Sequence, residues 1–356
     1  MPRLPASSGR PTHRTIARVA GVSIATVSLA LRNHGSIPAK TCRRIQGIAE
    51  RLGYRPDAQL VRLMAHVRQS RRVTPTATIG VLTAYEEKSP WRRNAYLERV
   101  YRGLETRAER LGYRLEEHWL TEPGMPPGRL RQIMLARGIE GLLIVGTPTW
   151  VEKLEFDFDR FACATIGYSI RQGFHRACQH QYQEMFQVLR HLGSLRYGRP
   201  GLVLSADTDE RTLHHYSSAF GWVQQRWPAR ERVPILTAEP IEAGIFGAWF
   251  EKHRPGVVIA QSPGVSVIRE WLRRLGAPVP AKCGLISLDV DLSLSPTATG
   301  IRQDYESVAA AAVDLVVAQL LRNERGLPVV PKTTLIEGTW VDGATTLPPV
   351  VLGHSR

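Results

Sequence analysis

The sequence predicts a multidomain protein in which an all-α unit at the N-terminus precedes a larger α/β unit with parallel sheets. Its 356 residues exceed the usual size of a single domain. Up to about residue 56, apolar residues recur only at helical spacing, whereas from Ala77 onward short apolar strands alternate with amphipathic helices. The charge changes near the same point, because residues 1–72 hold 14 Lys and Arg against two acidic residues, a net of +12 out of +15.

The basic N-terminal end favours a polyanionic partner, since clustered Lys and Arg attract phosphate backbones. A merely solvated basic surface is the alternative. The first eleven residues lack the apolar core of a secretory signal, and no stretch approaches the ~20 apolar residues of a membrane helix. The cysteines are widely scattered without CxxC spacing, which suits a reducing compartment. We therefore expect a cytoplasmic protein with no membrane partner.

Two short helices are expected directly after a disordered basic tail of residues 1–11. The first begins after Thr12, a suitable N-cap, ends at Gly21, and buries Ile16, Val19 and Ala20. Ser23 caps the second, which buries Val27, Ala30 and Leu31. Its outward side chains are Ile24, Ala25, Ser28 and Leu29. Two such helices over a tight turn predict a helix-turn-helix, whose second helix enters the DNA major groove; a generic helical hairpin is the alternative.

A third helix is expected over 38–52, with Gly53 as its stop and a buried stripe of Ile45, Ile48, Ala49 and Leu52. The whole stretch AGVSIATVSLALRNHGSIPAKTCRRIQGIAERLGYRPD resembles the DNA-binding head of the lactose-repressor-type (LacI/GalR) family of transcriptional regulators. The family pattern is AGVS, then TVS, an Asn-containing loop and a GYxPN-like end. The resemblance implies a helix-turn-helix DNA-binding domain over 12–56, followed by a hinge helix and linker over 57–76.

The resemblance also implies which residues contact DNA. Ile24 and Ala25 hold the first exposed positions of the second helix, where apolar side chains touch thymine methyl groups. Leu29 stands where the family commonly has an Arg that contacts guanine. The remaining residues of the expected DNA-binding set are Ser23, Thr26, Ser28, Arg32, Asn33 and Leu63. The polar members suit phosphates or nearby bases, although local backbone bonding would also explain the hydroxyls. Leu63 aligns with the hinge leucine that parts a base step in the minor groove, with core packing as its alternative.

The remainder of the chain alternates strands with helices. Strands are expected at ATIGVL, YRLEEHW, GIEGLLIVG, ACATIGY, PGLVLSA, VPILTAE, GVVIAQS and CGLISLD. Helices are expected at NAYLERVYRGLETRAERLG, RLRQIMLARG, HQYQEMFQVLRHLGSLRYG and VIREWLRRLG. This order predicts parallel sheets covered by helices, and it is too long for one small sheet, so two lobes are expected.

Five segments of this part resemble the periplasmic-binding-protein-like core of the same family: NAYLERVYRGLE, LRYGRPGL, CGLISLDVD, TATGIRQDYESVAAAAVDLVVAQL and IEGTWVDGATT. The resemblance implies an effector-binding and dimerisation core over 77–346. Its expected N-lobe is 77–177 plus 305–325, its C-lobe is 178–304 plus 326–346, and a C-terminal tail covers 347–356.

An effector cleft between the lobes is implied by the same resemblance. Asn94 and Tyr96 match the polar and aromatic positions after the first strand, and Asp289 matches an acidic residue at a C-lobe strand end. These types suit a ligand with hydroxyl groups, such as a sugar. Arg211 and His215 are weaker candidates, with an ordinary surface position as the alternative. His180 and Ser262 depart from the Asp or Asn-Asp that the family often has, which points to an unusual effector or to its loss.

Metal and catalytic chemistry have little support in the sequence. His175, Cys178 and His180 have a spacing that is not a standard zinc pattern, and they fall across an expected loop and helix start. His214 and His215 form only a pair. Phosphate-loop, zinc-protease and serine-hydrolase motifs are missing. The expectation is a protein that is not an enzyme and holds no cofactor or metal.

The sequence therefore predicts a sequence-specific transcriptional regulator, a repressor rather than an activator, that binds a near-palindromic operator in double-stranded DNA as a homodimer. A small-molecule effector in the cleft would modulate it. A tetramer is not expected, because only ten residues follow Thr346 and they carry no leucine heptads. The alternatives are an effector-independent DNA-binding protein and a solute-binding receptor built on the same core.

Overall fold

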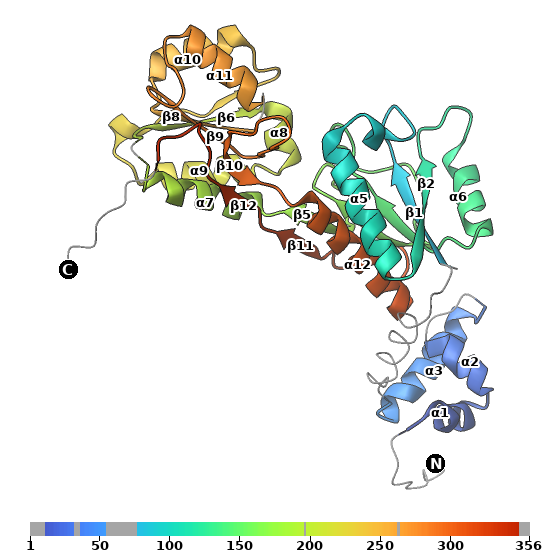
Figure 1. Cartoon of the computed structure of the whole chain (residues 1–356). Helices are drawn as coiled ribbons and strands as arrows, with labels where there is room; N and C mark the ends of the chain where they lie inside the picture. The colour runs from blue at the N-terminus through green and yellow to red at the C-terminus, as the bar shows by residue number, and fades with distance from the viewer. Residues whose placement is uncertain (1–10, 32–35, 55–76, 196, 262–263, 349–356) are drawn as a thin grey trace.

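The computed structural model describes residues 11–31, 36–54, 77–195, 197–261 and 264–348. It contains a small helical head and a larger α/β part divided into two lobes (Figure 1). A helical head before a core with predominantly parallel sheets is the fold class that the sequence predicts, and it is confirmed.

The head consists of α1 (His13–Ala20), α2 (Ile24–Leu31) and α3 (Ala39–Arg51). Thr12 caps α1 as expected, and Gly21 ends it in the left-handed conformation with φ of 67°. Ile16, Val27 and Ile45, one from each helix, are completely buried in a shared core, and each stabilises the head by roughly 1.5–3 kcal/mol. Val19 was expected in this core but is 44% exposed, because the helix turns Ala17 inward instead.

The first lobe is built on a sheet of six parallel strands in the order β11-β5-β4-β3-β1-β2. The strands are β1 (Ala77–Thr83), β2 (Tyr113–Trp119), β3 (Gly141–Ile144), β4 (Ala162–Ile166), β5 (His175–Gln179) and β11 (Thr333–Ile336). One face packs against α5 (Ala95–Arg110) and α12 (Tyr305–Arg322), and the other against α6 (Pro127–Ala136) (Figure 1). A short 3-10 helix, η1 (Pro90–Arg92), precedes α5.

The second lobe repeats this three-layer arrangement with the strand order β12-β10-β9-β8-β6-β7. Its strands are β6 (Pro200–Ser205), β7 (Leu236–Ala238), β8 (Val257–Ala260), β9 (Gly284–Ser287), β10 (Thr299–Arg302) and the antiparallel edge strand β12 (Thr339–Val341). Its helices are α7 (Gln181–Leu192), α8 (Ala206–Arg211), α9 (His215–Gln224), α10 (Ala243–His253), α11 (Val265–Arg274) and the 3-10 helix η2 (Ala229–Glu231). The sheet lies between α7 with α9 on one face and α10 with α11 on the other.

The chain crosses between the lobes three times: from β5 to α7, from β10 to α12, and from β11 to β12. The last crossing corrects the expected division of the chain, in which all of 326–346 belonged to the C-lobe. β11 pairs with β5 in the first sheet, with Thr333 opposite Arg176, and only β12 lies in the second sheet. β5 also spans the expected boundary at 177/178. Main-chain pairing decides the place of a short edge strand, and its sequence pattern does not reveal the partner.

A buried carboxylate ties the three crossings together. Glu184, in the first turn of α7, is completely buried. Its Oε2 accepts hydrogen bonds from Gln303 Nε2 at 2.8 Å and from the hydroxyl of Tyr216 at 2.9 Å, and its Oε1 accepts one from Gly338 N at 3.2 Å. Gln303 belongs to the second crossing and Gly338 to the third. Every lobe movement therefore involves segments joined to this one carboxylate.

Candidate functional site

The exposed start of α2 is the first candidate site. The Ser23 hydroxyl accepts a hydrogen bond from Thr26 N at 3.0 Å, so it caps the helix as expected. Val27 is buried, whereas Ile24 is 45% exposed and Ala25 is also exposed. The surface at the beginning of α2 is therefore apolar at its most accessible positions.

The rest of α2 and its neighbours frame this apolar surface. Thr26, Ser28 and Leu29 are half-buried along the same helix. Arg44 Nη1, from α3, donates to the carbonyl of Ala20 at 3.0 Å and fastens the turn before α2. Exposed basic residues of the described head are Arg14, Arg18, Lys40, Arg43, Arg44 and Arg51. The expected contacts Arg32, Asn33 and Leu63 lie outside the described residues.

The second candidate site is a cavity of about 270 Å³ between the two lobes. The first lobe contributes Tyr85, Tyr96, Leu97, Val145, Gly146, Ile166, Gly167, Tyr168, Ser169, Gln179 and Tyr305. The second lobe and the crossings contribute Gln181, Thr208, Arg211, Thr212, Tyr216, Gln261, Leu288, Asp289 and Gln303. A molecule in this cavity would contact both lobes at once, so its binding would depend on their relative position.

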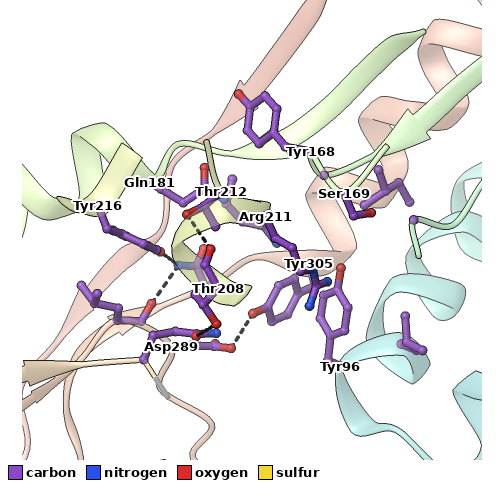
Figure 2. A pocket seen from close by; sticks show the side chains of 18 of the residues that line it. Tyr96, Tyr168, Ser169, Gln181, Thr208, Arg211, Thr212, Tyr216, Asp289 and Tyr305 are labelled. Atoms are coloured by element: carbon purple, nitrogen blue, oxygen red, sulfur yellow. Dashed lines mark hydrogen bonds between the residues drawn. The ribbon is translucent and has the colours of Figure 1, made fainter. Parts of the chain in front are cut away.

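Asp289 follows β9 and is fastened to the first lobe. The hydroxyl of Tyr305, at the start of α12, donates to its Oδ2 at 2.5 Å, and the Tyr305 ring meets the ring of Tyr96 edge to face with centroids 4.6 Å apart (Figure 2). Burial raises the pKa of Asp289 to about 6, against the opposing effects of the Tyr305 hydrogen bond and of Arg99. Its carboxylate therefore bridges the lobes with one oxygen engaged.

Arg211 extends from α8 toward Tyr96 and Tyr305 (Figure 2). Its Nη1 lies 3.5 Å from Asp207 Oδ2, the outer limit of a hydrogen bond, and its buried Nε has no partner among the described residues. Burial raises the pKa of Tyr96, and the charge of Arg211 opposes that rise. The guanidinium thus faces the first-lobe wall of the cavity.

The structure brings together three of the five predicted effector residues: Tyr96, Arg211 and Asp289 line the cavity. Asn94 does not line it, because its side chain caps α5 by accepting from Leu97 N at 3.1 Å. His215 is not among the lining residues either. Its ring meets the ring of Tyr168 edge to face, with the centroids 5.0 Å apart.

Most of the polar lining was not predicted. The unpredicted members are Tyr85, Tyr168, Ser169, Gln179, Gln181, Thr208, Thr212, Tyr216, Gln261, Gln303 and Tyr305. Two of these side chains, Gln181 and Gln303, are 6% and 3% exposed, and each has a buried Oε1 atom without a partner among the described residues. The sequence offers one signal for these two residues: Gln181 lies in the first turn of α7 and Gln303 lies just before α12.

The histidine and cysteine cluster considered for a metal has other contacts. His175 and Cys178 lie in the buried strand β5, not in a loop, and His175 Nδ1 accepts from Lys332 N at 3.0 Å. His180 Nδ1 caps α7 by accepting from Gln183 N at 3.3 Å. Across the described ranges, no group of three or more His, Cys, Asp or Glu is arranged to hold a metal ion. Nor does any single described helix have the length and apolar character of a membrane span.

Two family models match the chain where the two sites lie. Residues 13–57 match the model of bacterial regulatory proteins of the lacI family, and residues 189–346 match the model of a periplasmic binding protein-like domain. The chain therefore carries a DNA-binding domain of the lacI family and a periplasmic binding protein-like domain. The first match covers α1 to α3, and the second covers most of the second lobe with α12.

One known protein and two solved structures are similar to this chain. Catabolite control protein A of Streptococcus mutans is 26% identical over 145 residues, which are 41% of this chain and 39% of the relative, so the match spans about two fifths of its length. The structure of a transcriptional regulator CelR–cellobiose complex has a TM-score of 0.52 at 15% identity, covering 94% of this chain and all of the other. The lac repressor dimer bound to operator and an anti-inducer has a TM-score of 0.53 at 16% identity, covering 96% of this chain and all of the other. At these identities the structures establish the fold.

Proposed function

We propose that this lacI-family protein is a transcriptional regulator that reads DNA with α2 and responds to a small molecule bound between its lobes. The observation that carries the proposal is the exposed start of α2 on a basic three-helix head, where Ile24 and Ala25 present apolar side chains. In a helix-turn-helix these positions meet base edges in the major groove. Thymine methyl groups are the matching contact for them.

The remaining predicted contacts complete the DNA interface. The hydroxyl groups of Ser23, Thr26 and Ser28 contact phosphates or nearby bases. The guanidinium group of Arg32 and the amide group of Asn33 do the same. Leu63 is proposed as the wedge that enters the minor groove. Leu29 offers no hydrogen bond, so the protein reads an operator that differs from the guanine-containing sites an Arg at this position would select.

The protein acts as a repressor and binds its operator as a homodimer. Two heads on a two-fold axis place their recognition helices in successive major grooves, about 34–36 Å apart, so the operator is near-palindromic. The lac repressor structure, described as a dimer bound to operator, supports this arrangement for a chain of the same fold. The site of action is the cytoplasm, where the chromosome lies.

The effector binds the cavity lined by Tyr96, Arg211 and Asp289. Because both lobes line this cavity, a ligand changes the relative stability of open and closed lobe positions and so the placement of the heads. The complex of the similar regulator CelR with cellobiose supports a hydroxylated small molecule such as a sugar as the kind of ligand. An effector-independent DNA-binding protein is the second candidate, favoured by the departures of His180 and Ser262 from the family pattern.

Selection of bound DNA from a random library tests the proposal. The expected result is a two-fold-symmetric site, rich in A·T pairs at the positions read by Ile24 and Ala25. The Ile24→Asn, Ala25→Asn double variant is selected in parallel. Both residues are exposed, so the buried core of the head is unchanged, and the variant is expected to lose or change the selected sequence. Binding of all sequences with equal affinity would contradict sequence-specific regulation.

A further inference from the structure

One end of the inter-lobe cavity gathers positive charge. Arg211 is the only Lys or Arg among the residues that line the cavity within the described part of the chain. Its Nε is buried without a partner, and its contact with Asp207 is long at 3.5 Å. It shares the cavity lining with Tyr85 and Tyr96, whose phenol groups are protonated hydrogen-bond donors at neutral pH. This end of the cavity suits a ligand group that accepts hydrogen bonds and carries negative charge.

Three long helices begin at the same cavity. α5, α7 and α12 all begin at the cavity, since Tyr96, Gln181 and Tyr305 from their first turns line it. The first turn of each helix also holds an acidic residue, Glu98, Glu184 or Glu306, which offsets the partial positive charge of the helix end, so Arg211 is the group that favours an anion here. Asp289 is the only carboxylate in the lining of the described chain, and one of its oxygens is taken by Tyr305.

The cavity lining also contains two amide oxygens that require hydrogen-bond donors. Gln303 donates with Nε2 to Glu184 Oε2 and to the carbonyl of Leu288, at 2.8 and 2.9 Å, which fixes its amide so that Oε1 is left as an acceptor. Oε1 of Gln181 is likewise buried and unpartnered within the described residues. A buried acceptor without a partner destabilises the protein, so these two atoms favour a ligand that donates hydrogen bonds to them. Neutral hydroxyl groups supply such donors.

On the premise that the cleft takes the effector of the regulator proposed above, we propose that this effector is a hydroxylated monocarboxylate rather than a neutral sugar. Its carboxylate binds Arg211, and its hydroxyl groups donate to Gln181, Gln303 and Asp289. One guanidinium balances one negative charge, whereas a phosphate dianion would leave a charge uncompensated beside Asp289. The tyrosine rings pack against the carbon chain of the ligand.

Matched pairs of ligands test the proposal by isothermal titration calorimetry on the full-length protein. D-Gluconate is compared with sorbitol, in which a CH₂OH group replaces the carboxylate, and D-galacturonate with D-galactose. D-Glucose 6-phosphate tests whether any anion suffices. At least one acid is expected to bind about tenfold or more tightly than its neutral partner, as a charge-assisted hydrogen bond provides, and more tightly than the phosphate.

Two arginine variants locate the charge preference. Arg211→Gln is expected to abolish the difference between the acid and its neutral partner while leaving binding of the neutral compound within a few fold. Arg226→Gln is the control, because Arg226 lies over the exposed ring of Trp222, 3.4 Å from its centroid, outside the cavity lining. That variant is expected to keep the preference.

Several outcomes would overturn the proposal. These are tighter binding of a neutral compound than of its acid, tighter binding of the phosphate, a preference that survives Arg211→Gln, or no binding by either acid at millimolar concentration. DNA selection, measured separately, distinguishes the premise from the inference. A symmetric operator with a neutral effector would leave the regulator in place and refute only the acidic ligand, whereas binding of DNA without sequence preference would refute the regulator itself.

Discussion

At the scale of single residues, Glu184 shows how one buried group couples distant segments. It accepts three hydrogen bonds from different parts of the chain, yet burial still raises its pKa to about 7. The hydrogen bonds from Gln303 and Tyr216 oppose that rise but do not cancel it. The group is therefore easier to protonate in the folded protein than in the unfolded chain, where its pKa is near the ordinary 4.5.

We expect this difference to appear as a loss of stability with rising pH. The raised folded-state pKa stabilises the fold fully below about pH 4.5, and the contribution is lost as pH rises through about 7, with a total of about 3 kcal/mol. Urea unfolding of wild type between pH 5 and pH 8 measures the loss. Glu184→Gln does not titrate, so its free energy of unfolding is expected to fall less over this range.

Glu242→Gln is the matched control, since Glu242 is exposed. It is expected to follow the pH profile of wild type. A Glu184→Gln variant whose profile is also parallel to that of wild type would show that Glu184 titrates normally.

At the scale of elements, α2 combines buried positions that hold it in the head with apolar positions that we propose to contact DNA. Its Ser23 cap and its buried Val27 and Ala30 hold the helix in place, while Leu29 is half-buried on the side that faces DNA in the proposed complex. The buried positions that hold the helix and the exposed positions that we propose to contact DNA therefore lie on different faces of one short helix, so the exposed face can change without loss of the buried one.

Leu29→Arg is expected to add a guanine to the selected operator, because an Arg can bind O6 and N7 of guanine in the major groove. The discrimination expected for such a contact is about 1–3 kcal/mol against other bases at that position. Selection from a random DNA library measures the change. Leu29→Met is the control and is expected to select the wild-type site; a guanine already required by wild type at this step would contradict the apolar assignment.

The cleft depends on the contact between the helices α5 and α12. These helices approach closely at Gly103, where an added Cβ would lie 2.6 Å from the carbonyl oxygen of Glu306. Arg99 Nη2 and Arg102 Nη2 hold the carboxylate of Glu306 at 3.1 and 2.9 Å. Because α12 carries Tyr305 into the cavity, the close approach also positions the site.

Gly103→Ala is expected to lower the free energy of unfolding by about 1–3 kcal/mol, the usual cost of overpacking against backbone that cannot move aside. Gly128→Ala in α6 is the matched control, because an added Cβ there meets nothing within 4 Å. That control is expected to leave the free energy of unfolding unchanged or to raise it slightly, since Ala has a higher helix propensity than Gly. Equal denaturation midpoints for the two variants would contradict the close packing.

At the scale of the whole molecule, the head and the two-lobed part have separate cores. The cluster around Ile16 and Ile45 contains only head residues, and the four clusters of the core contain only residues from Ile79 onward. Each part therefore buries its own apolar surface, which is the condition for independent folding.

A fragment of residues 77–356 is expected to fold with the thermal midpoint of the core in the full-length protein and to keep ligand binding. It is expected to lose DNA binding, because every proposed contact lies in 23–63. Scanning calorimetry and a DNA mobility shift on both proteins measure these properties. A lower midpoint for the core in the fragment would show that the head stabilises it.

The sequence by itself determined features that depend on near neighbours. The helices of the head, the cap at Ser23, the stop at Gly21 and the alternation of strands and helices all follow from spacing and local backbone preference. Where several faces of a short helix were plausible, as for Val19, the pattern was insufficient because packing against α3 decides which residue turns inward.

Only the tertiary structure decided what meets across the lobes. Gln181, Gln303 and Tyr305 reach one cavity because two of the crossings bring the start of α7, the end of β10 and the start of α12 together, although Gln181 lies more than a hundred residues before the others. β11 joins the first sheet by main-chain hydrogen bonds that any side chains of similar type could accompany. Long-range strand pairing and burial, which local composition does not encode, thus determine which side chains line the cleft. The three-helix structure of the head, by contrast, could be predicted from its local sequence.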